Sequence, residues 1–206
     1  MSDVADRSSR RRFVAALGAS VGSVGLAGCL SSGFGRRNAT PDRTVYVGAY
    51  HWGFVLLDAD GTERERLTFA PGTEIKLVAF STRAERAIAE LPRAVRQSLP
   101  DHETLEVRNA ERLPAPPDGT MHDALEEADR RYPDHSVAVM PSGYNHARGG
   151  MGGGMMLHPM ALPHDAPRPS VAGLRATDRG DYSLSCLTYC GYGHPYMDLD
   201  GAFVVS

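Results

Sequence analysis

Runs of β-branched, aromatic and aliphatic residues at the two ends of the chain predict β-strands. Residues 44–57 form the longest run, and a turn signal at 58–61 ends it. Shorter runs at 66–69 and 74–81 follow, with a Pro-Gly turn between them. The same pattern predicts further strands at 136–140, 170–176, 182–185 and 202–205.

The middle of the chain has a different pattern. Apolar residues recur at helical spacing in 82–98, where Pro92 interrupts them, and again in 121–131. Between these segments, residues 102–109 have the composition of a short strand. Strands at both ends with mixed elements between them predict an all-β fold, a Greek-key β-sandwich with a mixed α/β insertion at about 82–145.

Length, composition and charge narrow the class of protein. At 206 residues the chain is long enough for one domain with its own core. The formal net charge is −3, and the 22 basic residues, nearly all of them arginine, form no basic stripe. This distribution argues against nucleic acid as a partner.

The first residues are expected to be a targeting signal rather than part of the fold. Ser9-Arg10-Arg11-Arg12-Phe13-Val14 matches the twin-arginine export pattern. A weakly apolar run follows, too short and too rich in small residues to span a bilayer stably, and no other apolar run of the sequence reaches membrane length.

Export is expected to end in lipid anchoring. Leu26-Ala27-Gly28-Cys29 is similar to a lipobox, in which Cys29 would be lipidated after cleavage. We therefore expect a signal at 1–28, a tether at 29–43 and a domain at 44–206, held by lipid on the outer face of the cytoplasmic membrane. An ordinary cleaved signal with an incidental Cys29 is the alternative.

The segment from Cys186 to Met197 carries the most specific chemical signal, with Cys190 and His194 between its ends. Thiolate and thioether sulfur are soft donors that favour copper, and imidazole suits copper as well as zinc. Met197 favours copper because a thioether is a poor zinc ligand. From the cysteine count alone, a Cys186–Cys190 disulfide in an exported domain is the alternative.

The pattern C-x3-C-x3-H-x2-M resembles the copper A (CuA) loop of cytochrome c oxidase subunit II and of nitrous oxide reductase. The resemblance implies a cupredoxin fold with a dinuclear copper site, bridged by the thiolates of Cys186 and Cys190. It also implies that His194 is one terminal imidazole, that Met197 is the axial thioether and that Thr188 supplies a backbone carbonyl. The implied role is one-electron relay, because the filled coordination leaves no position for a substrate.

The resemblance covers about 44–81 and 160–205. Residues 45–54 are similar to the family's aromatic first strand, in which an aromatic side chain near the copper receives the incoming electron. Trp52 matches that position, and a tryptophan that only fills the core is the alternative. The segments 69–81 and 180–186 are also similar to the family, in a Pro-Gly turn with its strand and in the approach to the copper loop.

The second histidine ligand is absent from its usual place. In the family it stands a few residues after a serine that closes a strand, and here Arg86 occupies that position after Ser81. We expect His146, four residues after Ser142, to replace it. His158 is the alternative, because the segment that begins with it resembles the family's H-S-F-x-V-P motif. The other candidates are expected to be exposed or structural: His51, His102, His122 and His135.

The resemblance implies a membrane-anchored copper protein that relays electrons from a small copper protein or cytochrome c toward subunit I of a haem-copper oxidase. A free-standing relay is also open, because subunit II normally docks through a transmembrane helix. A copper carrier or assembly factor is the second hypothesis, based on methionines set among glycines: Met151, Met155, Met156 and Met160. A cupredoxin that has lost its metal and keeps a disulfide is the third.

Overall fold

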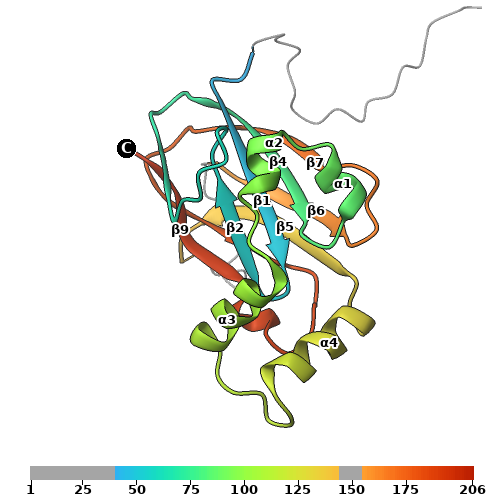
Figure 1. Cartoon of the computed structure of the whole chain (residues 1–206). Helices are drawn as coiled ribbons and strands as arrows, with labels where there is room; N and C mark the ends of the chain where they lie inside the picture. The colour runs from blue at the N-terminus through green and yellow to red at the C-terminus, as the bar shows by residue number, and fades with distance from the viewer. Residues whose placement is uncertain (1–39, 144–154) are drawn as a thin grey trace, which may run out of the picture. The chain divides into compact units, whose positions relative to one another are not determined.

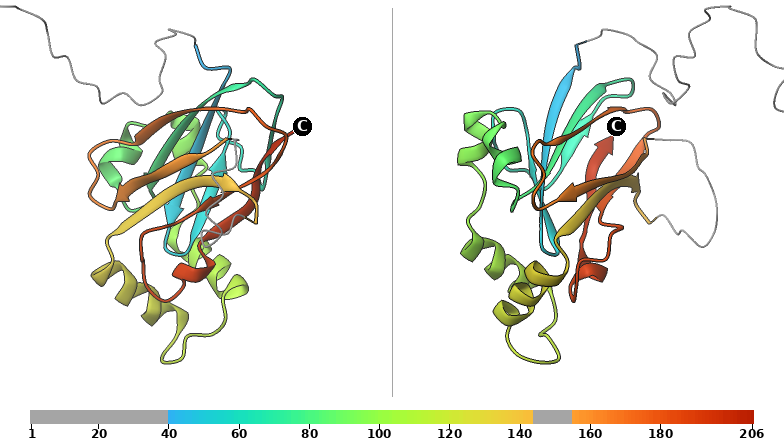
Figure 2. Two further views of the ribbon diagram at one scale, coloured as in Figure 1. Left: turned by 180° about the vertical axis from the view of Figure 1, so that it is seen from behind. Right: turned by 90° about the vertical axis from the view of Figure 1, so that its right-hand side faces the viewer.

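The computed structural model describes residues 40–143 and 155–206, and within these ranges nine strands form two sheets (Figures 1 and 2). The first sheet has the order β2-β1-β4-β7. Its strands are β1 (Arg43–Tyr50), β2 (Gly53–Leu57), β4 (Glu74–Ser81) and β7 (Ser170–Arg175). β1 is antiparallel to β2 and parallel to β4, whereas β7 closes the sheet antiparallel to β4.

The second sheet has the order β3-β9-β8-β5-β6. Its strands are β3 (Leu67–Phe69), β9 (Asp198–Val205), β8 (Gly180–Ser185), β5 (Asp134–Pro141) and β6 (Leu157–Pro163). β5 therefore lies inside the sheet, between β8 and β6, although it falls within the segment expected to be an insertion.

The alternation of side chains along β1 explains how the sheets are covered. Val45, Val47 and Ala49 point to the core between the sheets. Tyr46 and Tyr50 point to the other side, where they pack with residues of the helices. One face of the first sheet thus meets the second sheet and the other is covered by helices, as expected when both faces of a strand are apolar.

Four helices connect β4 to β5: α1 (Glu85–Ala89), α2 (Arg93–Gln97), α3 (His102–Arg112) and α4 (Met121–Arg131). In Figures 1 and 2, α1 and α2 lie against the first sheet, while α3 and α4 lie at one end of the sandwich. The predicted helix at 121–131 is confirmed, and Thr120 with Asp123 forms a capping box at its start.

The prediction of a strand at 102–109 is wrong, because these residues belong to α3. The Asp101 carboxylate accepts a hydrogen bond from the Thr104 amide at 2.8 Å, which caps the helix. Leu105 and Asn109 are buried one turn apart, so the buried positions follow a helical period.

The predicted strand at 44–57 is two strands, β1 and β2, joined by a tight turn at His51-Trp52. Trp52 has a φ of 70°, which non-glycine residues rarely adopt. The remaining predicted strands agree with the structure within a few residues at each end, apart from the longer N-terminal part of β9.

The two sheets form a cupredoxin-like β-sandwich, and the predicted fold class is confirmed. Among the described residues no helix is long and apolar enough to cross a membrane. The predictions for the twin-arginine segment, for Cys29 and for His146 fall outside the described residues.

Candidate metal centre

The sulfur-rich loop connects β8 to β9. The Cys186 amide donates to the Met197 carbonyl at 3.1 Å and so closes the loop at its base, and a short 3₁₀ turn at His194–Tyr196 leads into Met197. Cys190 Sγ lies 3.6 Å from His194 Nδ1 and 3.5 Å from Met197 Sδ. The loop therefore brings together the sulfur and imidazole groups that the sequence pattern predicts.

The Thr188 carbonyl also faces this group, 3.2 Å from Cys186 Sγ. Cys190 and Met197 are fully buried and Cys186 is 5% exposed, whereas His194 is half-buried. Both cysteines are free thiols rather than a disulfide. The sulfur donors are thus shielded from water, and His194 is the donor nearest the surface.

A second imidazole reaches the cysteines from His135 at the start of β5. One donor atom each of His135, Cys186 and Cys190 lie within 4.8 Å of one another, and His135 is fully buried. Pairing of β5 with β8 brings the start of β5 to the base of the loop, with Ala138 opposite Ser185. We call His135, Cys186, Cys190, His194 and Met197 the sulfur group.

Ser136, next to His135, fixes the base of the loop to β5. Its amide donates to Cys186 Sγ at 3.4 Å, and its hydroxyl accepts a hydrogen bond from the Leu187 amide at 2.9 Å. Each of these two contacts includes a backbone amide, so the fold sets the position of Cys186 relative to β5.

The other histidine candidates lie elsewhere or are not placed. His158 is exposed on β6, and His146 is outside the described residues. Arg86 lies on α1, where its guanidinium donates to the Asp165 carbonyl at 2.9 Å. His102 and His122 are exposed, whereas His51, like His135, is buried.

A sequence signal for His135 was present. The H-S-F-x-V-P motif, which led to His158, fits His135-Ser136-Val137-Ala138-Val139-Met140 better, since the histidine, the serine and the valine are matched, although Val137 stands for Phe and Met140 for Pro. His135 falls within the segment expected to be an insertion, and it was therefore expected to be exposed or structural.

Trp52 lies directly against the loop. Its indole Nε1 donates to the Cys190 carbonyl at 2.9 Å, and its ring meets that of Tyr192 edge-on at 5.7 Å between centroids. Trp52 has no exposed surface. It therefore occupies the position expected for an aromatic side chain beside the sulfur group, and it also fills the core.

Two glycines allow the loop to approach this tryptophan. Gly191 has a φ of 99°, which favours glycine. At Gly193 a Cβ would lie 2.3 Å from Trp52 Cγ and 2.4 Å from a methyl carbon of Leu113. The sequence Cys-Gly-Tyr-Gly-His is therefore required by close packing as well as by ligand spacing.

The two thiols share one environment but titrate in opposite directions. The neighbouring Cys190 thiol, together with the His135 imidazole and the Ser136 amide beside the sulfur, lowers the pKa of Cys186. The Cys186 partner and burial raise the pKa of Cys190. The two thiols therefore share one proton more readily than they hold two, and a bound cation would favour loss of the remaining proton.

These residues fit a metal ion by donor type and by position. Two cysteine sulfurs, two imidazoles, a thioether and a carbonyl converge, and both ring nitrogens of His135 are buried without a hydrogen-bond partner among the described residues. Soft sulfur donors combined with imidazole select copper over harder ions.

No protein-family model matches the sequence, and no curated protein matches it. Solved structures that are similar include the periplasmic domain of subunit II of cytochrome oxidase of Bradyrhizobium japonicum, at 9% identity and a TM-score of 0.40, over 82% of this chain and 86% of that chain. Another is a heme-copper terminal oxidase dimer, at 11% identity and a TM-score of 0.37, over 80% and 65%. A third is a mixed disulfide intermediate between a thioredoxin-like protein and subunit II of cytochrome c oxidase, at 8% identity and a TM-score of 0.39, over 84% and 87%. Because these values are low, any assignment of a metal to this chain depends on its own donor groups.

Proposed function

We propose that this protein binds copper in the sulfur group as a dinuclear CuA-type centre and carries single electrons outside the cytoplasm. The observation that carries the proposal is the convergence of His135, both cysteines, His194 and Met197 around one buried point. When bound, the copper pair supplies one-electron redox chemistry. The chain supplies donors that stay in place when the charge of the centre changes.

The roles follow from position. Cys186 and Cys190 would supply the thiolates that hold the copper, and His135 and His194 would supply the two imidazoles. Met197 and the Thr188 carbonyl complete the set as weak donors. His135 replaces His146 and His158 in this proposal because it is buried beside the cysteines, whereas His158 is exposed.

The scaffold supports electron transfer by holding these donors between packed strands. β8 and β9 fix the ends of the loop, β5 fixes His135, and the Trp52 indole fixes the Cys190 carbonyl. A rigid donor set limits the structural change that accompanies gain or loss of an electron.

A redox partner, such as a small copper protein or cytochrome c, would dock beside His194. Three apolar side chains of the loop are exposed there: Leu187 at 42%, Tyr189 at 59% and Tyr196 at 44%. The ring of Tyr189 lies 5.5 Å from that of His194. Trp52 is buried, so an electron that reaches it would pass from the surface through the half-buried Tyr192, which touches its ring.

The localisation in this proposal comes from the sequence. The twin-arginine pattern would export the folded protein, and lipid on Cys29 would hold it at the outer face of the membrane. Subunit I of a haem-copper oxidase is the proposed acceptor on that face.

The test is electron paramagnetic resonance and optical absorption of copper-loaded protein. We expect the hyperfine pattern of one electron shared by two equivalent coppers, together with the purple mixed-valence absorption. Cys190→Ser should abolish both. A two-copper spectrum that persists in that variant would remove the CuA proposal.

The ligand assignment is tested by three matched histidine variants. His135→Ala should localise the electron on one copper, because both bridging thiolates remain while one terminal imidazole is lost. His146→Ala and His158→Ala should leave the spectrum unchanged. If His146→Ala alone localises the electron, the ligand is His146.

A copper carrier is the second candidate, and the same samples distinguish it. One exchangeable Cu(I), with no mixed-valence spectrum, would indicate a carrier. Its sequence basis is weakened by Met155, which is 2% exposed and packs in the main core rather than offering its sulfur to solvent.

A further inference from the structure

A second cluster of imidazoles lies beside the sulfur group and shares His135 with it, and its other two histidines have no role in the proposed relay. One ring nitrogen each of His51, His135 and His164 lie within 4.8 Å of one another. The three ring centroids are separated by 4.6 Å, 5.1 Å and 5.0 Å. We call these three residues the histidine group.

Three separate segments build the histidine group. His51 lies in the turn between β1 and β2, His135 begins β5, and His164 follows β6. The His164 amide donates to the Pro133 carbonyl at 2.9 Å, which keeps it beside the start of β5. The convergence therefore depends on tertiary structure and not on neighbouring positions in the sequence.

Several ring nitrogens of the histidine group lack partners. His51 Nδ1, His164 Nε2 and both nitrogens of His135 are buried without a hydrogen-bond partner among the described residues. His51 and His135 are 5% and 0% exposed. An unpaired buried polar group destabilises the fold, so several together in one place require an explanation such as a missing ligand.

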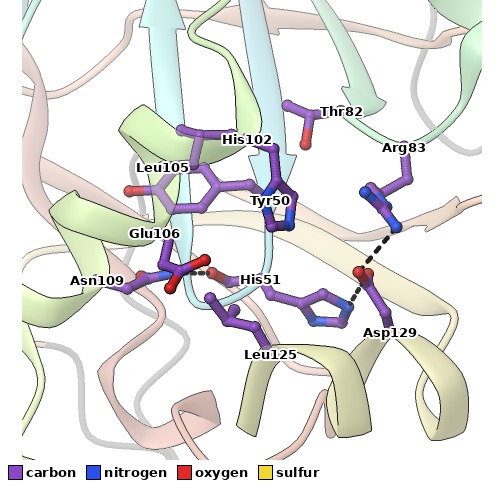
Figure 3. A pocket seen from close by; sticks show the side chains of 10 residues that line it. All are labelled: Tyr50, His51, Thr82, Arg83, His102, Leu105, Glu106, Asn109, Leu125 and Asp129. Carbon is purple, nitrogen blue, oxygen red and sulfur yellow. Dashed lines mark hydrogen bonds and ion pairs between the residues drawn. The ribbon is translucent and has the colours of Figure 1, made fainter. Parts of the chain in front are cut away.

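Asp129 on α4 orients the cluster from outside. Its Oδ1 lies 2.9 Å from His51 Nε2, and its Oδ2 lies 2.8 Å from an Arg83 guanidinium nitrogen. Figure 3 shows His51 pointing at this carboxylate, with Arg83 on the far side. A carboxylate at one imidazole nitrogen is the usual support for a metal at the other nitrogen, and here the other one is the unpartnered Nδ1.

A small pocket lies against His51 and Asp129, at one edge of this cluster. It has a volume of about 30 Å³ and reaches His51 between α3, α4 and the segment after β4 (Figure 3). Tyr50, Asn109 and Leu125 are among its lining residues. The pocket is large enough for a water molecule or a partly dehydrated ion.

The geometry is close to that of a metal site. A tetrahedral ion with metal–nitrogen bonds of about 2.0–2.1 Å holds its nitrogens about 3.3 Å apart. Nitrogens already within 4.8 Å of one another reach that separation by small rotations of the rings. Imidazoles favour divalent ions of the zinc and copper class.

We propose that His51, His135 and His164 form a second metal site, which binds a divalent ion such as Zn²⁺ or Cu²⁺ through imidazole nitrogens, with Asp129 orienting His51. The site does not depend on copper in the sulfur group. Since His135 is common to both groups, the test first removes the thiolates, so that this imidazole serves the histidine group alone.

The test measures zinc bound to the full-length Cys186→Ser/Cys190→Ser variant by calorimetry and by metal analysis after gel filtration. We expect one equivalent of Zn²⁺. Adding His164→Ala should weaken binding at least tenfold, and adding His158→Ala, the matched exposed control on β6, should leave it unchanged. Repeating the titration with Cu²⁺ tells which of the two ions the site prefers.

Asp129→Asn provides an independent readout, because it leaves the three imidazoles in place. It should weaken zinc binding by about 10–100-fold, the usual effect of removing a carboxylate that orients a ligating histidine. Circular dichroism confirms folding of each variant. A folded Cys186→Ser/Cys190→Ser protein that binds no zinc, or that binds it equally well with His164→Ala, would overturn the proposal. Neither result would alter the copper spectrum of the unmodified chain, which tests the relay separately.

Discussion

Replacement of Trp52 by phenylalanine tests how firmly the core holds the metal-binding loop. The indole Nε1 is the donor to the buried Cys190 carbonyl at 2.9 Å. Without that donor the carbonyl remains buried and unpaired, which costs about 1–3 kcal/mol. Phenylalanine is also smaller by about 40 Å³, and at 24 cal/mol per Å³ the cavity adds about 1 kcal/mol.

We therefore expect Trp52→Phe to lower the free energy of unfolding of the metal-free protein by about 2–4 kcal/mol. The positive φ at this position contributes nothing to the difference, because phenylalanine has the same backbone restriction as tryptophan. Urea unfolding followed by circular dichroism measures the loss through a shift of the midpoint at constant slope. Tyr196→Phe, at a residue 44% exposed, is the matched control and should change stability by less than about 0.5 kcal/mol. A loss below about 1 kcal/mol for Trp52→Phe would refute the role given to the indole hydrogen bond.

The two remaining predictions use the same unfolding assay. Gly193→Ala should destabilise the metal-free protein by about 1–3 kcal/mol, because its Cβ would lie 2.3 Å from Trp52 Cγ; unchanged stability would mean that the loop does not pack on the indole. Burial, and then His135 and His51, lower the pKa of His164 from 6.5 to about 4, and Asp129 and Arg83 also face this imidazole. The folded state therefore binds fewer protons than the unfolded chain between these pH values. Stability should fall as the pH drops from 6.5 toward 4. His164→Gln should reduce this fall, and an identical pH profile for both proteins would contradict it.

The strands could be predicted from sequence because their side chains are selected by burial on a pleated surface. The β4 segment, Glu74–Ser81, was predicted with the same bounds as the structure has. The turn inside 44–57 was not predicted, since His51 and Trp52 lack the glycine or asparagine that normally marks a hairpin. The turn is instead stabilised from outside, by contacts that no local pattern contains.

Segment 102–109 was assigned to the wrong class for a similar reason. Its only apolar residues are Leu105 and Val107, spaced as in a strand. In the structure Leu105 is buried and Val107 is 51% exposed, so the apparent alternation is a coincidence of one exposed valine. The Asp101 cap was the local signal that favoured a helix.

Some donor groups of the candidate site lie within one loop, and the others are brought together only by the tertiary fold. Four donors within Cys186–Met197 could be found from spacing alone, because the loop brings its own residues together. The meeting of His135 with this loop could not be found from spacing, since it depends on the pairing of β5 with β8, and His51 and His164 join it from two further segments. A motif match can propose such a residue, but strand register decides it.

The helical segment between β4 and β5 packs against one side of the candidate site. From α3, Asn109 Nδ2 donates to the His51 carbonyl at 2.8 Å, and the Arg112 guanidinium donates to the Trp52 carbonyl. These two hydrogen bonds hold both residues of the β1–β2 turn, so the positive φ of Trp52 is maintained by tertiary contacts.

The same helical segment also contacts the loop. The Tyr192 hydroxyl donates to the Pro114 carbonyl at 3.1 Å, after α3, and the ring of Tyr132, after α4, meets that of Tyr189 at 5.1 Å. Because the helical segment covers the side of Tyr189 and Tyr192, a partner would reach His194 past the exposed loop residues Leu187 and Tyr196. The helices would therefore restrict which partners can reach the candidate site. Asp129, which contacts His51 of the histidine group, belongs to α4 of the same helical segment.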